Sequence, residues 1–563
     1  MSSVLGDKGL SAPGQGAAAP GLLDKERIIA GPGFNRWMVP PAALAIHLCI
    51  GMAYGFSVFW LPLSKQLATA GAGAACPKDM SFVAEMFATN CDWHVATLGW
   101  MYTLFFVFLG CAAAIWGGWL ERAGPRKAGV VSAVCWCGGM LISAVGIHLH
   151  QFWLMILGSG VIGGIGLGLG YISPVSTLIK WFPDRRGMAT GMAIMGFGGG
   201  AMIGSPLAVD LMKKFSTPTS NGVLEAFVIM ALVYFVFMIG GAFGYRVPAT
   251  GWKPAGWTPP APSTTNAMIT QRHVHVKRVW GIPQFWLIWM ALTMNVSAGI
   301  GVIGMASPML QEVFGGSLIG VAKRFGELDK AELAAIATVA GGFAALLSLF
   351  NIGGRFFWAS LSDKLGRKMT YVVFFVLGGI LYASLPGSAA AGSKLLFVGA
   401  VCIILSMYGG SFSTVPAYLA DIFGTQFVGA IHGRLLTAWS TAGILGPVVV
   451  NYMREYQLGL GLPRSQVYNQ TMYILVGMLV IGLICNLLVR PLPDKWFMSD
   501  AELAHEKRLA HEKASAAEAG MGGAGAGVEA TPTIKVVLAW VAVGIPLAWG
   551  VYRTLIAAAK FFS

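Results

Sequence analysis

Long apolar segments follow one another along the chain and are separated by short polar ones. A helix needs about 20 apolar residues to cross the hydrocarbon core of a bilayer. Twelve segments of this kind occur, at 38–62, 94–119, 128–149, 152–179, 187–212, 224–245, 283–311, 333–361, 369–390, 395–419, 428–453 and 469–489. A thirteenth, shorter one lies at 536–552. The pattern predicts an all-α integral membrane protein with 12 transmembrane helices and an extra C-terminal transmembrane helix.

The extra segment is open to two interpretations. If it crosses the membrane after twelve spans, it leaves the C-terminus outside. Its short length, between Lys535 and Arg553, and the presence of Pro546 also fit a helix that lies on the membrane surface.

Polar segments rich in Pro, Gly and Ala divide the chain into domains. We expect a disordered cytoplasmic tail at 1–37, an N-terminal six-helix bundle at 38–246, a central cytoplasmic loop at 247–281, a C-terminal six-helix bundle at 282–491, a flexible cytoplasmic linker at 492–533 and the extra hydrophobic helix at 534–563.

The composition excludes a soluble globular protein. Only 11% of the residues are charged, whereas a soluble domain carries about 25%. The net charge of +14 is explained by topology, because cytoplasmic segments hold 24 of the 38 Lys and Arg residues when the N-terminus is inside. Outer segments hold 12, and Arg355 and Arg434 lie within spans. We expect a multi-pass protein of the cell inner (plasma) membrane with a cytoplasmic N-terminus, and no nucleic-acid partner.

An internal repeat relates the two halves of the chain. At an offset of 242 residues, Glu121 aligns with Asp363, Gly124 with Gly366, Pro174 with Pro416, Gly187 with Gly429, Gly191 with Gly433 and Gly204 with Gly446. Both copies run over the spans in the same order, so the halves are parallel six-helix pseudo-repeats. A long loop between two such halves is typical of a rocker-type secondary transporter.

The loops within the repeat resemble the G-x-L-x-D-x-x-G-R-[KR] signature of the major facilitator superfamily. They read Gly118-Trp-Leu-Glu-Arg-Ala-Gly-Pro-Arg-Lys127 and Ser360-Leu-Ser-Asp-Lys-Leu-Gly-Arg-Lys368. Within that superfamily, residues 181–191, 351–355 and 423–433 resemble the oxalate/formate antiporter family. The resemblance covers about residues 38–491 and implies the major facilitator fold and transport of small carboxylates.

The same loops predict a conformational latch. A carboxylate at a cytoplasmic helix end can pair with basic residues of the neighbouring bundle and stabilise one access state. The residues expected to take part are Glu121, Arg122, Asp363, Arg367 and Lys368. The first copy has Pro125 where the signature has a basic residue, so its latch is expected to be weaker.

Arg355 is the strongest candidate for a substrate-binding residue, because ionisable residues inside a span are costly and usually functional. It lies eight residues before Asp363, which is roughly 12 Å along the helix. Asn351 shares its helix face. A guanidinium there can hold a carboxylate through two hydrogen bonds. The alternative is a structural arginine that caps carbonyls of a broken helix.

The resemblance implies that Arg355 binds the substrate carboxylate together with a second cation, a lysine in span eleven. This chain has Trp439 where that lysine is expected. One central cation balances one carboxylate, so the sequence favours a monocarboxylate over a dianion.

Aromatic residues are expected to complete the substrate-binding site. By approximate position, the resemblance implies His47, Tyr54, Tyr171, Phe197, Tyr408 and Phe412. His47 could couple protons to uptake, because histidine titrates near neutral pH. An ordinary packed histidine is the alternative.

The predicted function is secondary active transport of small carboxylates of the formate, oxalate or lactate/pyruvate type, by anion exchange or proton symport. A carrier of another small solute and a transporter-like sensor are the alternatives. No catalytic constellation, metal site or cofactor motif is found, so an enzyme is not expected, and a monomer is expected. Cys76 and Cys91, in a loop predicted to lie outside, are either free or joined by a disulfide.

Overall fold

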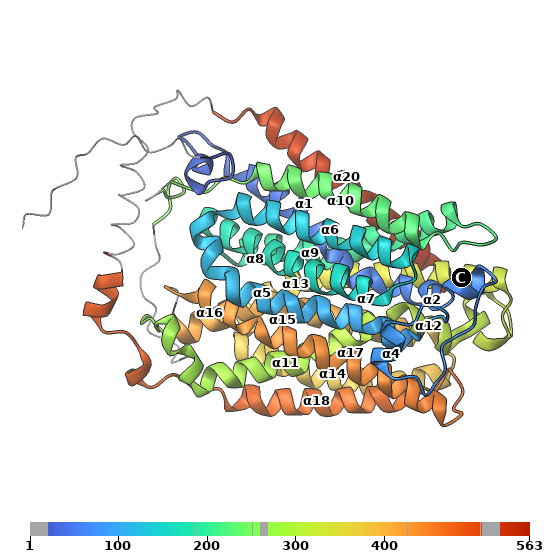
Figure 1. Cartoon of the computed structure of the whole chain (residues 1–563). Coiled ribbons are helices and arrows are strands. Elements are labelled where there is room, and N and C mark those ends of the chain that lie inside the picture. The colour runs from blue at the N-terminus through green and yellow to red at the C-terminus, as the bar shows by residue number, and fades with distance from the viewer. Residues whose placement is uncertain are drawn as a thin grey trace, which may run out of the picture.

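The computed structural model describes residues 21–562, except for 185, 250–251, 259–267, 425, 507 and 509–529. Within that part of the chain, 13 helices are long and apolar enough to cross a membrane. They lie side by side in one bundle (Figure 1). The predicted all-α fold, with 12 spans and one extra helix, is therefore confirmed.

Each half of the fold contributes six spans. The first half holds α1 (Val39–Ile50) continued by η3 (Gly51–Phe59) and α2 (Trp60–Leu63), α5 (Val95–Ala123), α6 (Pro125–His148), α7 (Phe152–Met155) continued by η4 (Ile156–Gly163) and α8 (Gly164–Trp181), α9 (Arg186–Phe215) and α10 (Val223–Gly244). The second half holds α11 (Pro283–Gly304), α12 (Ala306–Phe314), α13 (Lys330–Leu365), α14 (Arg367–Ala390), α15 (Lys394–Phe423), α16 (Val428–Leu435), α17 (Thr437–Gly459) and α18 (Asn469–Leu488). The extra helix is α20 (Thr533–Phe562).

The predicted seventh span, 283–311, is interrupted between α11 and α12. Pro308 has no N–H with which to bond the carbonyl four residues earlier, which is that of Gly304. Trp60 of the first half takes this role, since its Nε1 donates to the Gly304 carbonyl at 3.0 Å. The interruption of the helix thus leaves the Gly304 carbonyl free to accept a hydrogen bond that joins the two halves.

The halves meet along two seams, in which α5 packs against α17 and α9 packs against α13. These seams are related by the repeat, because the second helix of each half packs against the fifth helix of the other. We call the end of the bundle with the Asp363 loop the inner end, and the opposite end, with the Cys76–Cys91 loop, the outer end.

Residues 21–37 differ from the prediction of a disordered tail. They contain two short 3-10 helices, η1 (Lys25–Ile28) and η2 (Arg36–Met38). The Arg36 guanidinium donates two hydrogen bonds, of 2.7 and 3.0 Å, to the Asp184 carboxylate. This segment therefore packs on the inner end of the first half, whereas residues 1–20 lie outside the described part.

The basic patch 272–278 of the central loop is paired with acidic residues that follow α18. Arg272 pairs with Asp494 at 2.7 Å and Arg278 with Glu502 at 2.5 Å, and the His275 ring lies 3.6 Å from the Glu506 carboxylate. The charges of the two arginines are therefore balanced within the protein. Half of the predicted linker, residues 509–529, lies outside the described residues.

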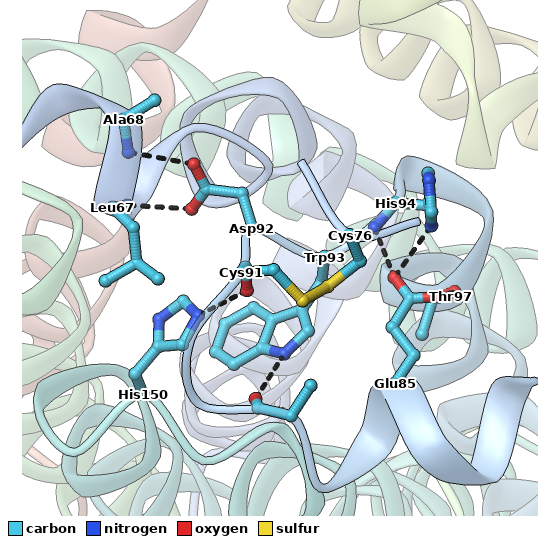
Figure 2. The surroundings of a disulfide bond; sticks show 11 residues. Leu67, Ala68, Cys76, Glu85, Cys91, Asp92, Trp93, His94, Thr97 and His150 are labelled. Carbon is cyan, nitrogen blue, oxygen red and sulfur yellow. Dashed lines mark hydrogen bonds and ion pairs between the residues drawn. A yellow bond between two sulfur atoms is a disulfide. The ribbon is translucent and has the colours of Figure 1, made fainter. Parts of the chain in front are cut away.

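The loop after the first span is closed by a disulfide between Cys76 and Cys91 (Figure 2). The adjacent Asp92 carboxylate accepts hydrogen bonds from the backbone N–H groups of Leu67 and Ala68, at 2.7 and 2.9 Å. Of the two states left open by the sequence, the structure has the disulfide.

Cysteine substitution tests the role of this disulfide. Its cysteines are 15 residues apart, and closing a loop of that length contributes about 3 kcal/mol in the chain-entropy model. We expect Cys76→Ser to raise the rate of proteolytic cleavage within the loop about tenfold or more under oxidising conditions. Cys111→Ser, which removes a free cysteine of α5, is the matched control. Equal cleavage of both variants would contradict a stabilising disulfide.

Candidate functional site

Arg355 lies within the apolar part of α13, and its side chain is fully buried. Its Nε donates to the Asn351 Oδ1 at 2.9 Å, and its guanidinium carbon lies 5.8 Å from the centre of the Phe412 ring. Among the described residues, neither Nη1 nor Nη2 has a hydrogen-bond partner. A buried cation with unpaired donors is unfavourable. This geometry therefore suits an anion that supplies the missing acceptors.

Helix α9 approaches Arg355 closely because residue 198 is glycine. A Cβ atom at this position would lie 2.9 Å from the Arg355 Nε and 2.7 Å from the Asn351 Oδ1. The Gly198 carbonyl accepts a hydrogen bond of 2.5 Å from the Ser348 hydroxyl. Because α9 belongs to the first half and α13 to the second, the cation lies on a seam between the two halves.

Aromatic rings surround Trp439 of α17 on several sides. The distances from its ring centre are 4.4 Å to Phe412, 5.1 Å to Tyr171, 5.4 Å to Phe197 and 5.6 Å to Phe106. Within the described part of the chain, the Trp439 Nε1 and the Tyr171 hydroxyl have no hydrogen-bond partner. They are two donors available to the polar atoms of a bound molecule.

Tyr54 and Tyr408 join the two halves beside this aromatic cluster. Their hydroxyl groups are 2.8 Å apart, with Tyr54 in η3 and Tyr408 in α15. Tyr54 also lines a small cavity together with Ser348 and Asn351. Every predicted substrate-site side chain is buried, so the site is enclosed in this conformation.

The predicted substrate-site residues therefore come together, although they are far apart in the sequence. Arg355 and Asn351 are on α13, Tyr54 on η3, Tyr171 on α8, Phe197 on α9, Tyr408 and Phe412 on α15 and Trp439 on α17. Their role in binding stays a prediction, because proximity alone does not establish it.

His47 lies beside this cluster, with its ring centre 5.5 Å from that of Tyr171 and 6.3 Å from that of Phe197. Its Nε2 lies 3.1 Å from the Tyr171 carbonyl, and its Nδ1 contacts the Ala193 carbonyl. A neutral imidazole has one N–H and can satisfy one of these carbonyls, whereas a protonated ring satisfies both. Its predicted part in proton coupling stays a hypothesis.

The predicted latch is described only in the second half. Arg367 pairs with Asp363 and lies 3.8 Å from the Asp421 carboxylate. Lys368 donates to two backbone carbonyls near the end of α18, each at 2.8 Å. These contacts all lie within the second half. The side chains of Glu121 and Arg122 lie outside the described residues, so the latch stays a prediction.

Two site residues were not identified from the sequence. Phe106 sits in a run of apolar residues, where nothing distinguishes a ring that faces the site from one that faces lipid. Gly198 belongs to the run Gly198-Gly-Gly200, which is a signal for close approach of two backbones.

Two parallel six-helix halves that pack against each other are the architecture of a class of secondary transporters. The family profile described as Major Facilitator Superfamily matches residues 43–447 and 327–560. The chain belongs to the Major Facilitator Superfamily.

Similar transporters agree with this assignment, and a solved structure has a similar fold. The chain is 29% identical to an oxalate:formate antiporter of Oxalobacter formigenes over 51% of this chain and 59% of the relative. It is 27% identical to apicoplast pyruvate carrier 1 of Toxoplasma gondii over 53% of this chain and 59% of the relative. The matched region thus spans about three-fifths of each relative. The crystal structure of a D-xylose-proton symporter is similar in fold, with a TM-score of 0.54 at 14% identity, covering 81% of this chain and 98% of the symporter.

Proposed function

We propose that the protein is a secondary active transporter that moves small monocarboxylates across the cell inner membrane by alternating access. The observation that carries this proposal is the buried Arg355, with two guanidinium nitrogens that lack partners among the described residues. A carboxylate supplies two acceptor oxygens in the planar arrangement that a guanidinium binds best.

The surroundings of Arg355 favour one negative charge on the substrate. The rings packed around the site are uncharged, and Trp439 stands where the oxalate/formate resemblance implies a lysine. The second end of the substrate would then contact neutral donors, namely the Trp439 indole and the Tyr171 hydroxyl. Lactate and pyruvate fit this requirement through their hydroxyl or keto oxygen, whereas formate matches the single charge but has no second polar group. The names of the two relatives support a small carboxylate in general, since one transports oxalate and formate and the other pyruvate.

Two coupling modes, anion exchange and proton symport, are compatible with this site. A bound carboxylate balances the charge of Arg355. In an exchange of one monocarboxylate for another, this charge is therefore balanced during both the inward and the outward step. Proton symport would use His47, whose two carbonyl neighbours can each accept a hydrogen bond from the protonated ring. The excess of Lys and Arg in segments at the inner end supports a cytoplasmic N-terminus.

Counterflow in proteoliposomes tests the substrate class. Vesicles loaded with unlabelled formate, lactate, pyruvate or oxalate are presented with the labelled compound at trace concentration. We expect accumulation of at least one monocarboxylate at a rate about tenfold or more above that of oxalate. Protein-free liposomes and vesicles loaded with D-xylose are the controls. Strong oxalate counterflow without counterflow of any monocarboxylate would overturn the proposed monocarboxylate transport and indicate a carrier of dianions instead.

A further inference from the structure

Helix α20 contacts both halves of the transporter. It packs against α1 and α9 of the first half and against α13 of the second, and Figure 1 shows it along one edge of the bundle. Near its N-terminal end, the Trp540 Nε1 donates to the Trp37 carbonyl at 3.1 Å. The preceding Thr531 hydroxyl accepts from the Asn35 backbone N–H at 3.1 Å. The helix therefore starts at the inner end of α1.

The other part of α20 lies near the outer end. Its Arg553 guanidinium donates two hydrogen bonds, of 2.6 and 3.0 Å, to the Asp210 carboxylate, and Asp210 is five residues before the end of α9. Helix α20 thus runs along the bundle from its inner towards its outer end. This course supports a thirteenth transmembrane span over a helix lying on the membrane surface.

Three helices meet closely at this outer site. A Cβ atom added at Gly341 of α13 would lie 3.1 Å from the Val209 Cγ2 of α9. One added at Gly342 would lie only 2.3 Å from the Ala557 Cβ of α20. Glycine is thus required at residue 342 for α20 to reach α13. We call the contact of Val209 and Asp210, Gly341 and Gly342, and Arg553 and Ala557 the outer junction.

We propose that α20 is a built-in clamp that holds the outer halves of α9 and α13 together. The clamp favours the conformations in which the outer end of the transport path is closed. The proposal rests on alternating access, in which the two halves separate at one end at a time.

The polar contact explains why the clamp resists opening. When the outer ends of α9 and α13 separate, α20 must leave one of them. If it leaves α9, Asp210 and Arg553 lose their partner inside a span, where unpaired charges are costly. If it leaves α13, the close packing of Ala557 on Gly342 is lost. Opening towards the outside therefore disrupts one of these contacts, whereas opening at the inner end leaves the outer junction intact.

Hydrogen exchange of the full-length protein in lipid nanodiscs measures this effect without any transport assay. The readout is the exchange rate of backbone amides in residues 205–212 of α9 and 339–345 of α13, which lie in the covered part of this seam and are expected to gain access to water when the outer end opens. We expect Asp210→Arg and Arg553→Asp each to raise this rate threefold or more. The double variant Asp210→Arg/Arg553→Asp should return it to the wild-type value, because the pair is restored with its charges exchanged.

Two further variants keep the test informative. Ala557→Leu retains every charge but crowds Gly342, so it should raise exchange in the same direction even if the charge variants fold poorly. Leu555→Ala changes an exposed side chain of the same helix and should leave exchange unchanged. The clamp is refuted if Ala557→Leu exchanges like the wild type, or if the double variant exchanges as fast as the single ones. Since no substrate is used, this result is independent of the proposed monocarboxylate transport.

Discussion

Replacing Arg355 with glutamine is expected to reduce counterflow of the transported carboxylate at least 100-fold, while leaving the protein folded in the membrane. The side chain contributes the fully buried charge of the site, and its two Nη atoms are the donors for which the described residues offer no acceptor. Loss of a charge-assisted hydrogen bond to a ligand in a desolvated site costs several kcal/mol, and each 1.4 kcal/mol is a factor of ten. Glutamine keeps much of the volume and removes the charge.

Two further variants separate charge from geometry. Arg355→Lys keeps the cation but lacks the planar fork, so it should retain a small part of the activity with a raised KM. Arg490→Gln removes a positive charge from an exposed position near the inner end and should transport like the wild type. Thermal unfolding and gel filtration check that Arg355→Gln is folded. Full counterflow by folded Arg355→Gln would exclude this residue as the anion site.

Replacing Glu312 with glutamine is expected to destabilise the protein by about 3–5 kcal/mol. The substitution removes the negative charge of a buried ion cluster and leaves the positive charge of its partner. The Glu312 carboxylate is inaccessible to solvent. It accepts hydrogen bonds from the Arg454 Nε at 2.8 Å, the Arg464 Nη1 at 2.5 Å and the Tyr468 hydroxyl at 2.6 Å. The cluster joins α12 to α17 and to the start of α18 at the outer end. Without the carboxylate, the buried Arg454 keeps its charge and loses its main partner.

The pH dependence of this effect has a defined sign. Burial alone would raise the pKa of Glu312, but the charge of Arg454 and hydrogen bonds from Arg454 and Tyr468 bring this pKa below its ordinary value of 4.5. The folded protein therefore binds this proton more weakly than the unfolded chain. The stabilisation is complete above about pH 4.5 and is lost as the pH falls through the lower pKa of the folded state.

Thermal unfolding in detergent measures both effects. The difference in unfolding free energy between wild type and Glu312→Gln should be constant from pH 8 to pH 5 and should shrink below about pH 4.5. Glu455→Gln is the matched control, because Glu455 also pairs with Arg454 but is partly exposed, so its loss should cost less than about 1 kcal/mol. Equal unfolding midpoints for Glu312→Gln and wild type at pH 7 would contradict a stabilising cluster.

Helix number and order could be predicted from the sequence because a membrane span imposes a minimum length on every apolar segment. The place of Arg553 inside the extra helix could not be predicted in the same way. The apolar segment 536–552 stops before Arg553, although the domain expected for the extra helix is 534–563, and α20 (Thr533–Phe562) includes this residue. A charged residue in an apolar stretch normally ends a span, and its pairing with Asp210 in another helix is not visible in local sequence.

In the site, too, features that depend on neighbouring residues could be predicted, whereas contacts between residues far apart in the sequence could not. Arg355 stands out because it is the lone cation of an apolar segment, and Asn351 follows from its spacing of four residues. The Tyr54–Tyr408 hydrogen bond joins residues 354 positions apart and has no local signal. The Glu312 cluster was missed for a related reason, since charges at the ends of apolar segments resemble ordinary loop residues.

The pairing of Asp210 with Arg553 also has a consequence for how the protein is made. The two residues are 343 positions apart, and ribosomes add roughly 5–20 residues per second. The carboxylate in α9 is thus synthesised on the order of 20 to 70 seconds before its cation emerges. Asp210 therefore has no access to this partner until residue 553 has been synthesised and α20 has packed against α9.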